Sequence, residues 1–217
     1  MAETSVTPAE PARPADGDGR TNRSARTRLA VVDALLSLNE KGNLRPTARE
    51  IADEAGVSLR SIYVHFDDVE SLLVAAAIRH TEHLQSLALS LLHDGPLEAR
   101  IDRLLAHRRR IYEAGPGIRR AALLQEPFSP ALQRAMDAGR AANRAEIDQV
   151  FATEIQSLPE PDGIRLRQAL SLVTGPTTWD VMRRHDGLSA DEAEEQLRRL
   201  VRAVLDAWTG AGEPPDT

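Results

Sequence analysis

The stretch Thr47–Leu73, TAREIADEAGVSLRSIYVHFDDVESLL, decides the fold of this chain. Thr47 and Glu50 have the spacing of a capping box, in which two side chains satisfy backbone amides at the start of a helix. Gly56 ends this helix early because glycine adopts the left-handed C-terminal conformation, and Ser58 can cap another helix immediately. Two short helices joined by so tight a turn cannot lie parallel. The spacing therefore predicts a helix-turn-helix.

The second of these helices, SLRSIYVHF, combines a buried face with a polar one. At about 100° per residue, Ile62 and Phe66 point inward, with Leu59 close by. The opposite face suits base edges in the major groove, since Arg pairs with guanine, Ser with several bases and a small apolar group with the thymine methyl. The residues of that outer face are Arg60, Ser61 and Val64.

Contacts to DNA phosphates are predicted beside this base-reading face. Flanking side chains reach the walls of the groove, and backbone amides at the starts of both helices can hold phosphate oxygens. The predicted residues are Thr47, Arg49, Ser58, Tyr63 and His65.

Charge is distributed unevenly along the chain. The formal net charge is -6, yet residues 20–66 contain eight basic and five acidic side chains. A basic segment on an acidic protein predicts that a polyanion contacts one end only. Scatter among solvated charges is the alternative interpretation.

Composition excludes several other classes. The 217 residues are 41% hydrophobic and 28% charged, which is typical of a globular protein. There is no cysteine, no GxSxG, phosphate-loop or HExxH motif, and no Glu-x-x-His pair for a di-iron site. No apolar run is long enough to cross a membrane, and the first nineteen residues lack the pattern of a secretory signal. We expect a cytoplasmic protein that is not an enzyme and has no cofactor or metal.

Two short motifs remain open to more than one interpretation. His80 and His83 could share a metal ion, although a surface or core-edge pair is the favoured reading. The run His107–Arg110, HRRR, could face an anionic ligand or a second DNA segment, and a solvated face is favoured there.

Helical periodicity recurs along the whole chain, so the predicted fold is all-α. We expect a disordered tail over 1–22, a three-helix DNA-binding domain over 23–68, a helical ligand-binding and dimerisation domain over 69–210, and a flexible tail over 211–217. The first helix is expected over 23–39, ending at Lys41-Gly42. The fourth is long, with Asp67 or Asp68 as its cap and Asp67-x-x-Glu70 as a capping box.

Further helices are predicted beyond the fourth, with caps at Ser129 and at Ser189-x-x-Glu192. A kink is predicted at Gly175-Pro176 because proline lacks the amide that continues a helix. The predicted ranges are 96–114, 117–126, 130–156, 163–184 and 190–208.

Residues 25–75 resemble the TetR/AcrR family of bacterial transcription regulators. The shared pattern is T-x-x-x-I-A-x-x-A-G-V-S-x-x-x-x-Y-x-x-F with a following L-L, matched by Thr47, Ile51, Ala52, Ala55, Gly56, Val57, Ser58, Tyr63, Phe66, Leu72 and Leu73. The resemblance implies that Tyr63 and His65 contact the operator backbone and that the outward face of the second helix reads bases. Val69 departs from the family, which usually has a phosphate-contacting Lys at this position.

The resemblance also implies a dimer formed by the last two helices and an inducer bound among the middle helices. Apolar stripes on the last two helices supply the interface candidates, and packing of both stripes on the chain's own core is the alternative. These candidates are Leu170, Val173, Leu197, Val201, Val204 and Trp208. The ligand-binding candidates are His107, Tyr112, Gln125, Trp179 and Met182, and Pro127 and Pro130 bracket a turn whose movement could open the pocket.

The sequence therefore predicts a dimeric DNA-binding regulator, and repression is the favoured mode of action. A small molecule of unknown identity would release it from a pseudo-palindromic double-stranded operator. The alternative is a helical small-molecule-binding or catalytic protein whose helix-turn-helix is incidental. The pattern does not distinguish repression from activation.

Overall fold

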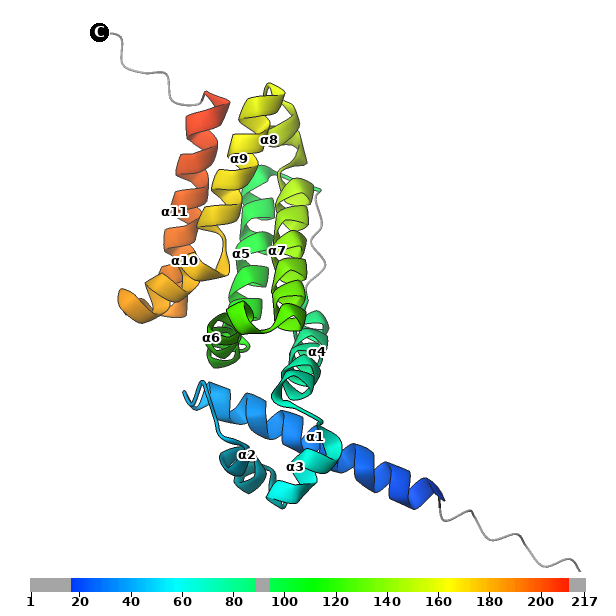
Figure 1. The fold of residues 1–217 in the computed structure, drawn as a ribbon. Helices are drawn as coiled ribbons and strands as arrows, with labels where there is room; N and C mark the ends of the chain where they lie inside the picture. Colours follow the sequence, from blue (N-terminus) through cyan, green and yellow to red (C-terminus); the bar gives the residue numbers. More distant parts are fainter. Residues whose placement is uncertain (1–16, 89–93, 211–217) are drawn as a thin grey trace, which may run out of the picture.

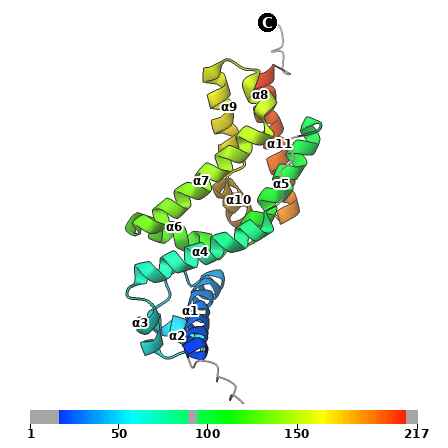
Figure 2. The ribbon, with the colours of Figure 1, turned by 90° about the vertical axis from the view of Figure 1, so that its right-hand side faces the viewer.

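The structure, a computed structural model, describes residues 17–88 and 94–210, and these residues form helices and no strands (Figure 1). The all-α prediction is confirmed. Helices α1, α2 and α3 lie at one end, helices α5 to α11 form a body at the other end, and α4 runs between them (Figure 2). Within the described ranges, no helix combines the length and apolarity needed to cross a membrane.

The DNA-binding end consists of α1 (Gly17–Glu40), α2 (Ala48–Ala55) and α3 (Leu59–His65). Helix α1 begins at Gly17, inside the tail predicted for 1–22, whose first sixteen residues lie outside the described part. Residues 21–26 of α1 are exposed and include two arginines and an alanine, which favour helix without tertiary contacts. The predicted start at residue 23 was therefore too late.

The predicted caps of α2 and α3 are confirmed. Glu50 N donates to Thr47 Oγ1 at 3.3 Å, and Thr47 N donates to the Glu50 carboxylate at 2.7 Å. Gly56 ends α2 with a left-handed φ of 65° and donates to the carbonyls of that helix. Ser58 Oγ accepts from Ser61 N at 3.2 Å and so starts α3. These local bonds set the sharp turn between the two helices.

Helix α4 (Val69–Leu87) belongs to both parts of the molecule. Its cap is Asp68, which forms a capping box with Ser71, so the predicted box of Asp67 with Glu70 is wrong. Leu72, one of its buried residues, shares a core with buried residues of the first three helices. The predicted domain boundary at 68/69 therefore cuts through this core, and the first turns of α4 belong to the DNA-binding end. The buried residues of that core are Val31, Val32, Ala34, Leu35, Ile51, Ala52, Ile62, Phe66, Leu72, Ala75 and Ala76.

The helical body contains α5 (Leu97–Glu113), α6 (Pro116–Gln125), a 3-10 turn (Glu126–Phe128), α7 (Pro130–Val150), α8 (Ala152–Gln156), α9 (Glu160–Val173), α10 (Pro176–Asp180), a π-helical turn (Val181–His185) and α11 (Ala190–Thr209). The caps at Ser129 and Ser189 are confirmed, and the Ser189 cap forms a box with Glu192. Residues 211–217, the predicted C-terminal tail, lie outside the described part.

Two long predicted helices are broken in the structure. The helix expected over 130–156 stops at Phe151, which leaves helical geometry and is fully buried in the body. The helix expected over 163–184 starts at Glu160 and is interrupted at Gly175-Pro176, where Pro176 begins α10. Proline suits the first position of a helix, where its missing amide needs no partner. The expected kink is therefore a complete break.

Candidate DNA-binding surface and ligand cavity

Helix α3 turns the predicted base-reading face to solvent. Ile62 and Phe66 are buried against α1 and α2, whereas Arg60 is exposed and Val64 retains 69% of its accessible surface. Tyr63, at 64%, is exposed beside this face. Leu59 is 41% exposed and not inward as predicted, because it is the first residue of a short helix and projects at its edge. An apolar residue in this position can contact DNA without loss of core packing.

Of the other side chains predicted to contact DNA phosphates, some are accessible and others already form hydrogen bonds within the protein. Arg49 is exposed on α2, and His65 is half-buried at the end of α3. The Ser58 and Ser61 hydroxyls lie 2.9 Å apart, so each is held in place by the other. The Thr47 hydroxyl lies 2.7 Å from the Glu50 carboxylate.

Glu50 is itself a negative group at the start of α2. Its pKa is lowered chiefly by the hydrogen bond from the Thr47 amide and then by the Thr47 side chain. The carboxylate is therefore ionised and already occupies the Thr47 amide. The Glu50 amide already donates to Thr47 Oγ1, so only the amides of Ala48 and Arg49 remain in the first turn of α2 for a DNA phosphate.

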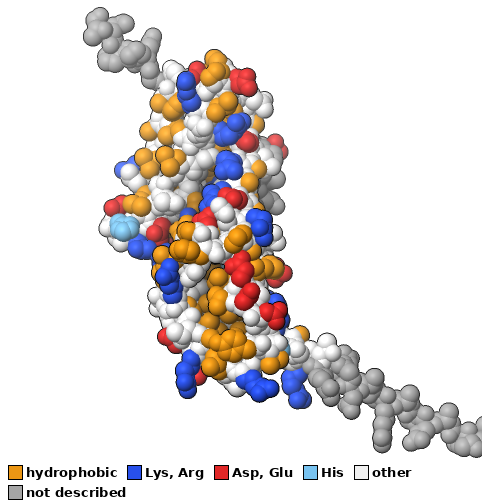
Figure 3. Space-filling model, in the orientation of Figure 1, with side chains coloured by type: hydrophobic (Ala, Val, Ile, Leu, Met, Phe, Trp, Pro, Cys, Tyr) orange, Lys and Arg blue, Asp and Glu red, His pale blue; other side chains and the backbone are white. Residues whose placement is uncertain are grey.

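Charged side chains hold α3 in position against its neighbours. The Arg28 guanidinium of α1 lies over the Phe66 ring at 4.8 Å from its centre, a cation–π contact. Lys41 pairs with Glu54 at 2.6 Å and joins the end of α1 to α2. Lys and Arg side chains are spread along this end of the molecule (Figure 3). The exposed face of α3 is therefore carried by a fixed and locally basic unit.

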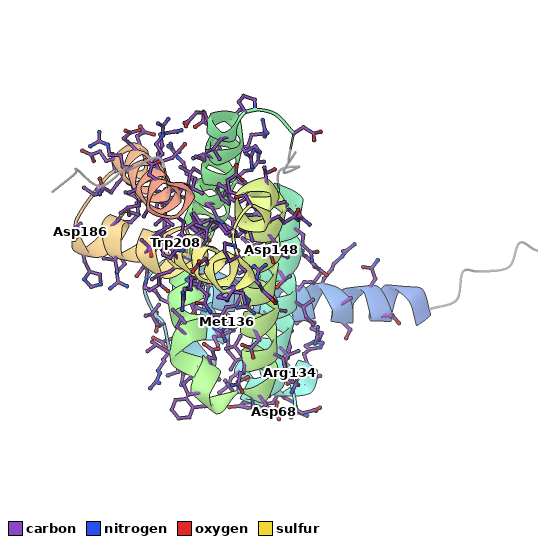
Figure 4. The ribbon with its side chains drawn as sticks, turned by 90° about the horizontal axis from the view of Figure 1, so that it is seen from above. Asp68, Arg134, Met136, Asp148, Asp186 and Trp208 are labelled. Atoms are coloured by element: carbon purple, nitrogen blue, oxygen red, sulfur yellow. The ribbon has the colours of Figure 1, made fainter. Side chains whose placement is uncertain are left out.

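Two hydrogen bonds to carboxylates join the DNA-binding end to the body. Glu40, at the end of α1, accepts from the Ile118 amide in the first turn of α6 at 2.8 Å. Glu70, in the first turn of α4, accepts from the Ser129 hydroxyl at 2.8 Å. Figure 4 shows Asp68 at the start of α4 and Arg134 near the start of α7 on the same side of the molecule. The two ends of the 116–130 segment thus each contact the DNA-binding end.

A cavity of about 1610 Å³ lies between the DNA-binding end and the body. Its wall is mainly apolar and combines residues of α1 and α4 with residues of α5, α6, α7 and the α9–α10 junction. Apolar residues that represent these helices are Leu36, Leu72, Ile111, Ala121, Leu132 and Met136. The volume exceeds the ~300–1,000 Å³ that is usual for small-molecule sites.

Three of the five predicted ligand residues line this cavity: His107, Tyr112 and Gln125. Trp179 and Met182 do not line it, because they are packed in the core of the body. Trp179 also donates its indole N–H to Glu113 at 2.8 Å. The prediction that these two orient a ligand is therefore corrected to a structural role.

A polar cluster that the sequence did not reveal adjoins the cavity. Arg108 is 1% exposed and pairs with Glu146 at 2.5 Å and with Asn143 Oδ1 at 2.5 Å. His107 Nε2 lies 3.5 Å from the Glu146 carboxylate. The favoured reading of HRRR as a solvated face is therefore wrong for its first two residues, although Arg110 is exposed. Sequence gave no signal for this, since the carboxylate and the amide come from distant α7.

The cavity also contains buried polar atoms without hydrogen-bond partners. They are Asn39 Oδ1, Arg108 Nε and Ser171 Oγ, and all three residues line the wall. Tyr112 nearby donates to the Thr174 carbonyl at 3.1 Å, and burial is the main cause that raises its pKa to about 12. Unsatisfied buried polar groups are costly, so a site with several of them is suited to a ligand or water that pairs with them.

The predicted dimer residues separate into two groups. Leu170, Leu197 and Val201 have no exposed surface in the single chain and pack in its own core. They cannot contact a second copy, so their assignment to an interface is corrected to the alternative, core packing. Val173, Val204 and Trp208 are partly buried at the edge of that core.

Metal-ligating side chains are dispersed in the described ranges, which contain no group of three or more of them suited to a metal ion. His83 is exposed, and His80 is half-buried beside Gly115. The pKa of His80 is lowered by burial and then by the neighbouring His83, so the His80 imidazole is neutral near pH 7. The pair thus lies at the edge of the structure, between α4 and α6.

Comparison with known proteins agrees with this geometry. Residues 33–76 match the sequence profile of the family described as bacterial regulatory proteins, tetR family. Residues 33–76 therefore form a DNA-binding domain of the tetR family. The matched range extends from α1 into α4 and so covers the helix-turn-helix and its shared core. Over this range the chain has the sequence pattern of the DNA-binding domain of tetR-family regulatory proteins.

Solved structures resemble this chain in fold over most of its length. A tetR-family transcriptional regulator from Streptomyces coelicolor is 19% identical, with a TM-score of 0.68 over 87% of this chain and 84% of that one. A transcriptional regulator from Rhodococcus sp. Rha1 is 16% identical, with a TM-score of 0.64 over 85% and 96%. The multidrug binding protein EbrR, complexed with imidazole, is 20% identical, with a TM-score of 0.54 over 80% and 93%. No curated protein sequence matches the chain.

Proposed function

We propose that this chain is a TetR-family regulator, which binds a pseudo-palindromic operator as a homodimer and acts as a repressor that a small molecule releases. Arg60, Ser61 and Val64 read base edges, and Tyr63 and His65 contact the flanking phosphates. The exposure of Arg60, Tyr63 and Val64 on a helix whose other face is buried supports these roles. Thr47, Arg49 and Ser58 contribute backbone contacts from the two helix starts.

The single observation that carries the ligand-dependent switch is the shared wall of the cavity. Leu36 and Leu72 belong to the DNA-binding end, whereas Ile111 and Leu132 belong to the body, and all four line the same space. A ligand that contacts both parts favours one relative arrangement of them. It releases DNA only if it binds that arrangement more tightly than the DNA-bound one. The imidazole complex of the structurally similar EbrR supports a ligand site in such a body.

A two-fold dimer follows from exposed apolar residues on the last helices of the body. Leu172 is 72% exposed on α9, and Ile164 is exposed on the same helix. Trp208 and Val204 are partly exposed on α11, which packs along α9. Two copies joined through α9 and α11 would set their α3 helices about 34–36 Å, or a multiple of that, apart on a palindromic site.

The experiment begins with the DNA. The purified protein selects fragments from genomic DNA, and the enriched sequence is used as a labelled operator. Compounds suggested by the neighbouring genes are titrated into free protein and into the protein–operator complex. A coupling of about 1 to 3 kcal/mol would weaken DNA binding roughly 5- to 150-fold, and the operator must weaken the ligand by the same factor. A compound that binds both forms equally is not the inducer, and a protein that selects no sequence would contradict the proposal.

A further inference from the structure

Arg119, in the middle of α6, is a half-buried cation without an acidic partner. Its Nη2 lies 3.4 Å from Thr177 Oγ1, and no described carboxylate lies within 4 Å of its guanidinium. The adjacent Arg120, by contrast, pairs with Asp180 at 3.7 Å. Burial is the main cause that lowers the pKa of Arg119, which shows that its charge is poorly solvated. A buried charge of this kind is costly unless another group compensates it.

This cation faces the cavity. Arg119 lines the wall together with Thr177, its only polar contact, and with Ser171, whose buried hydroxyl has no partner. Arg108, Arg119 and the buried Tyr112 all line this cavity. Arg108 is neutralised by Glu146 at 2.5 Å. The inner part of the cavity is therefore left with one guanidinium that has no carboxylate in ion-pair contact, since Asp180 and Glu126 act on Arg119 only from farther away.

The remaining charged residues of the wall do not cancel this charge. Arg45, Asp68 and Glu82 are exposed at the rim, where water screens them. Arg140 is exposed and already paired with Asp137 at 2.8 Å. The rest of the wall is mainly apolar. The lining thus combines a single positive centre with a large apolar surface.

We propose that the cavity binds an amphipathic anion whose carboxylate or similar oxyanion is held by Arg119 and whose apolar body lies along α4, α5 and α7. This inference rests on the proposed function of the cavity as the ligand site. A guanidinium binds a carboxylate through two parallel hydrogen bonds, and these are stronger where water is excluded. The Ser171 hydroxyl can donate a further bond to the head group.

The test compares three probes of equal chain length: dodecanoate, dodecanol and dodecylamine, each below its micelle concentration. Calorimetric titration into the full chain should show dodecanoate binding about 10- to 100-fold more tightly than the alcohol, as expected for a charge-assisted hydrogen bond. Arg119→Met should remove that preference while the affinity for dodecanol changes little. Arg120→Met is the matched control, since its guanidinium is paired with Asp180 and it is not part of the wall.

Thermal melting of the unliganded variants separates a binding role from a structural one. Arg119→Met should melt at the same or a higher temperature than the wild type, because it removes a half-buried charge that has no carboxylate in ion-pair contact. A lower melting temperature with unchanged dodecanoate affinity would assign Arg119 a structural role and overturn the proposal. Equal binding of all three probes, or binding of none, would overturn it as well. Dodecanoate binding that leaves operator affinity unchanged would instead contradict the proposed function and leave the anion site in place.

Discussion

Gly117 and Asn39 bring α6 and α1 into direct backbone contact. A β-carbon placed on Gly117 would lie 2.3 Å from the Asn39 carbonyl oxygen and 2.7 Å from the Glu40 α-carbon. Both of these are backbone atoms, so no side-chain movement can relieve the overlap. Any residue other than glycine must therefore push the two helices apart, at the junction where the Ile118 amide also bonds to Glu40.

Gly117→Ala should consequently lower the free energy of unfolding by about 1 to 3 kcal/mol, the range for an overpacked site. Gly139→Ala is the control, because Gly139 lies within α7 and a β-carbon there meets nothing within 4 Å. That substitution should stabilise the protein by about 0.4 to 1 kcal/mol through the greater helix propensity of alanine. Urea unfolding measures both, and equal effects of the two variants would contradict the close contact.

Arg60→Ala should weaken binding to the selected operator by about 1 to 3 kcal/mol and relax the preference at one base position. Tyr63→Phe should weaken all DNA sequences alike, since it removes a phosphate contact. Arg110→Ala, which changes an exposed arginine of α5 outside the DNA-binding end, serves as control. Unchanged affinity and unchanged base preference for Arg60→Ala in a fluorescence titration would show that α3 is oriented differently on DNA.

Val69→Lys should restore the phosphate contact that the family usually makes at this position. Val69 is the first residue of α4 and is well exposed, so a lysine there costs no core packing. One added contact should steepen the slope of log affinity against log salt concentration by about 0.9. Titrations at several salt concentrations measure this slope. An unchanged slope would show that the start of α4 does not reach the DNA backbone.

Ile164→Glu should convert the proposed dimer into a monomer, because it buries a charge at an apolar interface. Leu124→Glu provides a control of nearly equal exposure, since Leu124 is exposed on α6, away from α9. Light scattering at micromolar concentration distinguishes the two molecular masses. A monomeric wild type, or a dimer that survives Ile164→Glu, would exclude the proposed face.

The stability of the body should fall at acidic pH partly through Glu113. Hydrogen bonds from Arg183 at 2.9 and 3.1 Å, and then from the Trp179 indole, lower its pKa below the ordinary value of 4.5. The folded state thus binds the proton less readily than the unfolded chain. Its stabilising contribution is complete above about pH 4.5 and is lost as the pH falls through the lower folded-state pKa.

Glu113→Gln should therefore show a shallower loss of melting temperature than the wild type as the pH falls from about 5 through the lowered folded-state pKa of Glu113. Glu82→Gln, a change at an exposed carboxylate of α4, provides the matched control. Parallel pH profiles for the wild type and Glu113→Gln would show that this carboxylate adds nothing to the acid dependence.

Local signals in the sequence predicted several helix ends well. The boxes at Thr47 and Ser189 and the left-handed Gly56 are contacts between near neighbours, and all three are confirmed. The break at Phe151 was missed because burial of that side chain in the body, which the local sequence does not reveal, accompanies the end of α7. At Gly175-Pro176 the proline predicted a kink, and the structure has a complete break. Leu170, Leu197 and Val201 belong to apolar stripes on α9 and α11. Such a stripe has the same helical period whether it packs in the chain's own core or against a second subunit, so periodicity alone could not distinguish core from interface.

The candidate cavity was less predictable for a related reason. Its polar groups come from α1, α5, α6, α7 and α9, which are far apart in sequence. Arg119 and Arg120 are neighbours in the sequence, and the residues around them do not indicate which of the two forms an ion pair. Only the fold shows that Arg120 reaches Asp180 while Arg119 faces the cavity.

The shared core of α4 limits how this protein can be divided. A fragment that ended at residue 68 would leave the apolar faces of Leu35 and Ile62 uncovered, since Leu72 and Ala76 of α4 complete their packing. The smallest piece able to fold and bind DNA by itself must therefore continue through at least Ala76. Such a piece would still lack Ser129, the partner of Glu70. A DNA-binding fragment made in this way should respond to no ligand and could serve as a permanently active version of the regulator.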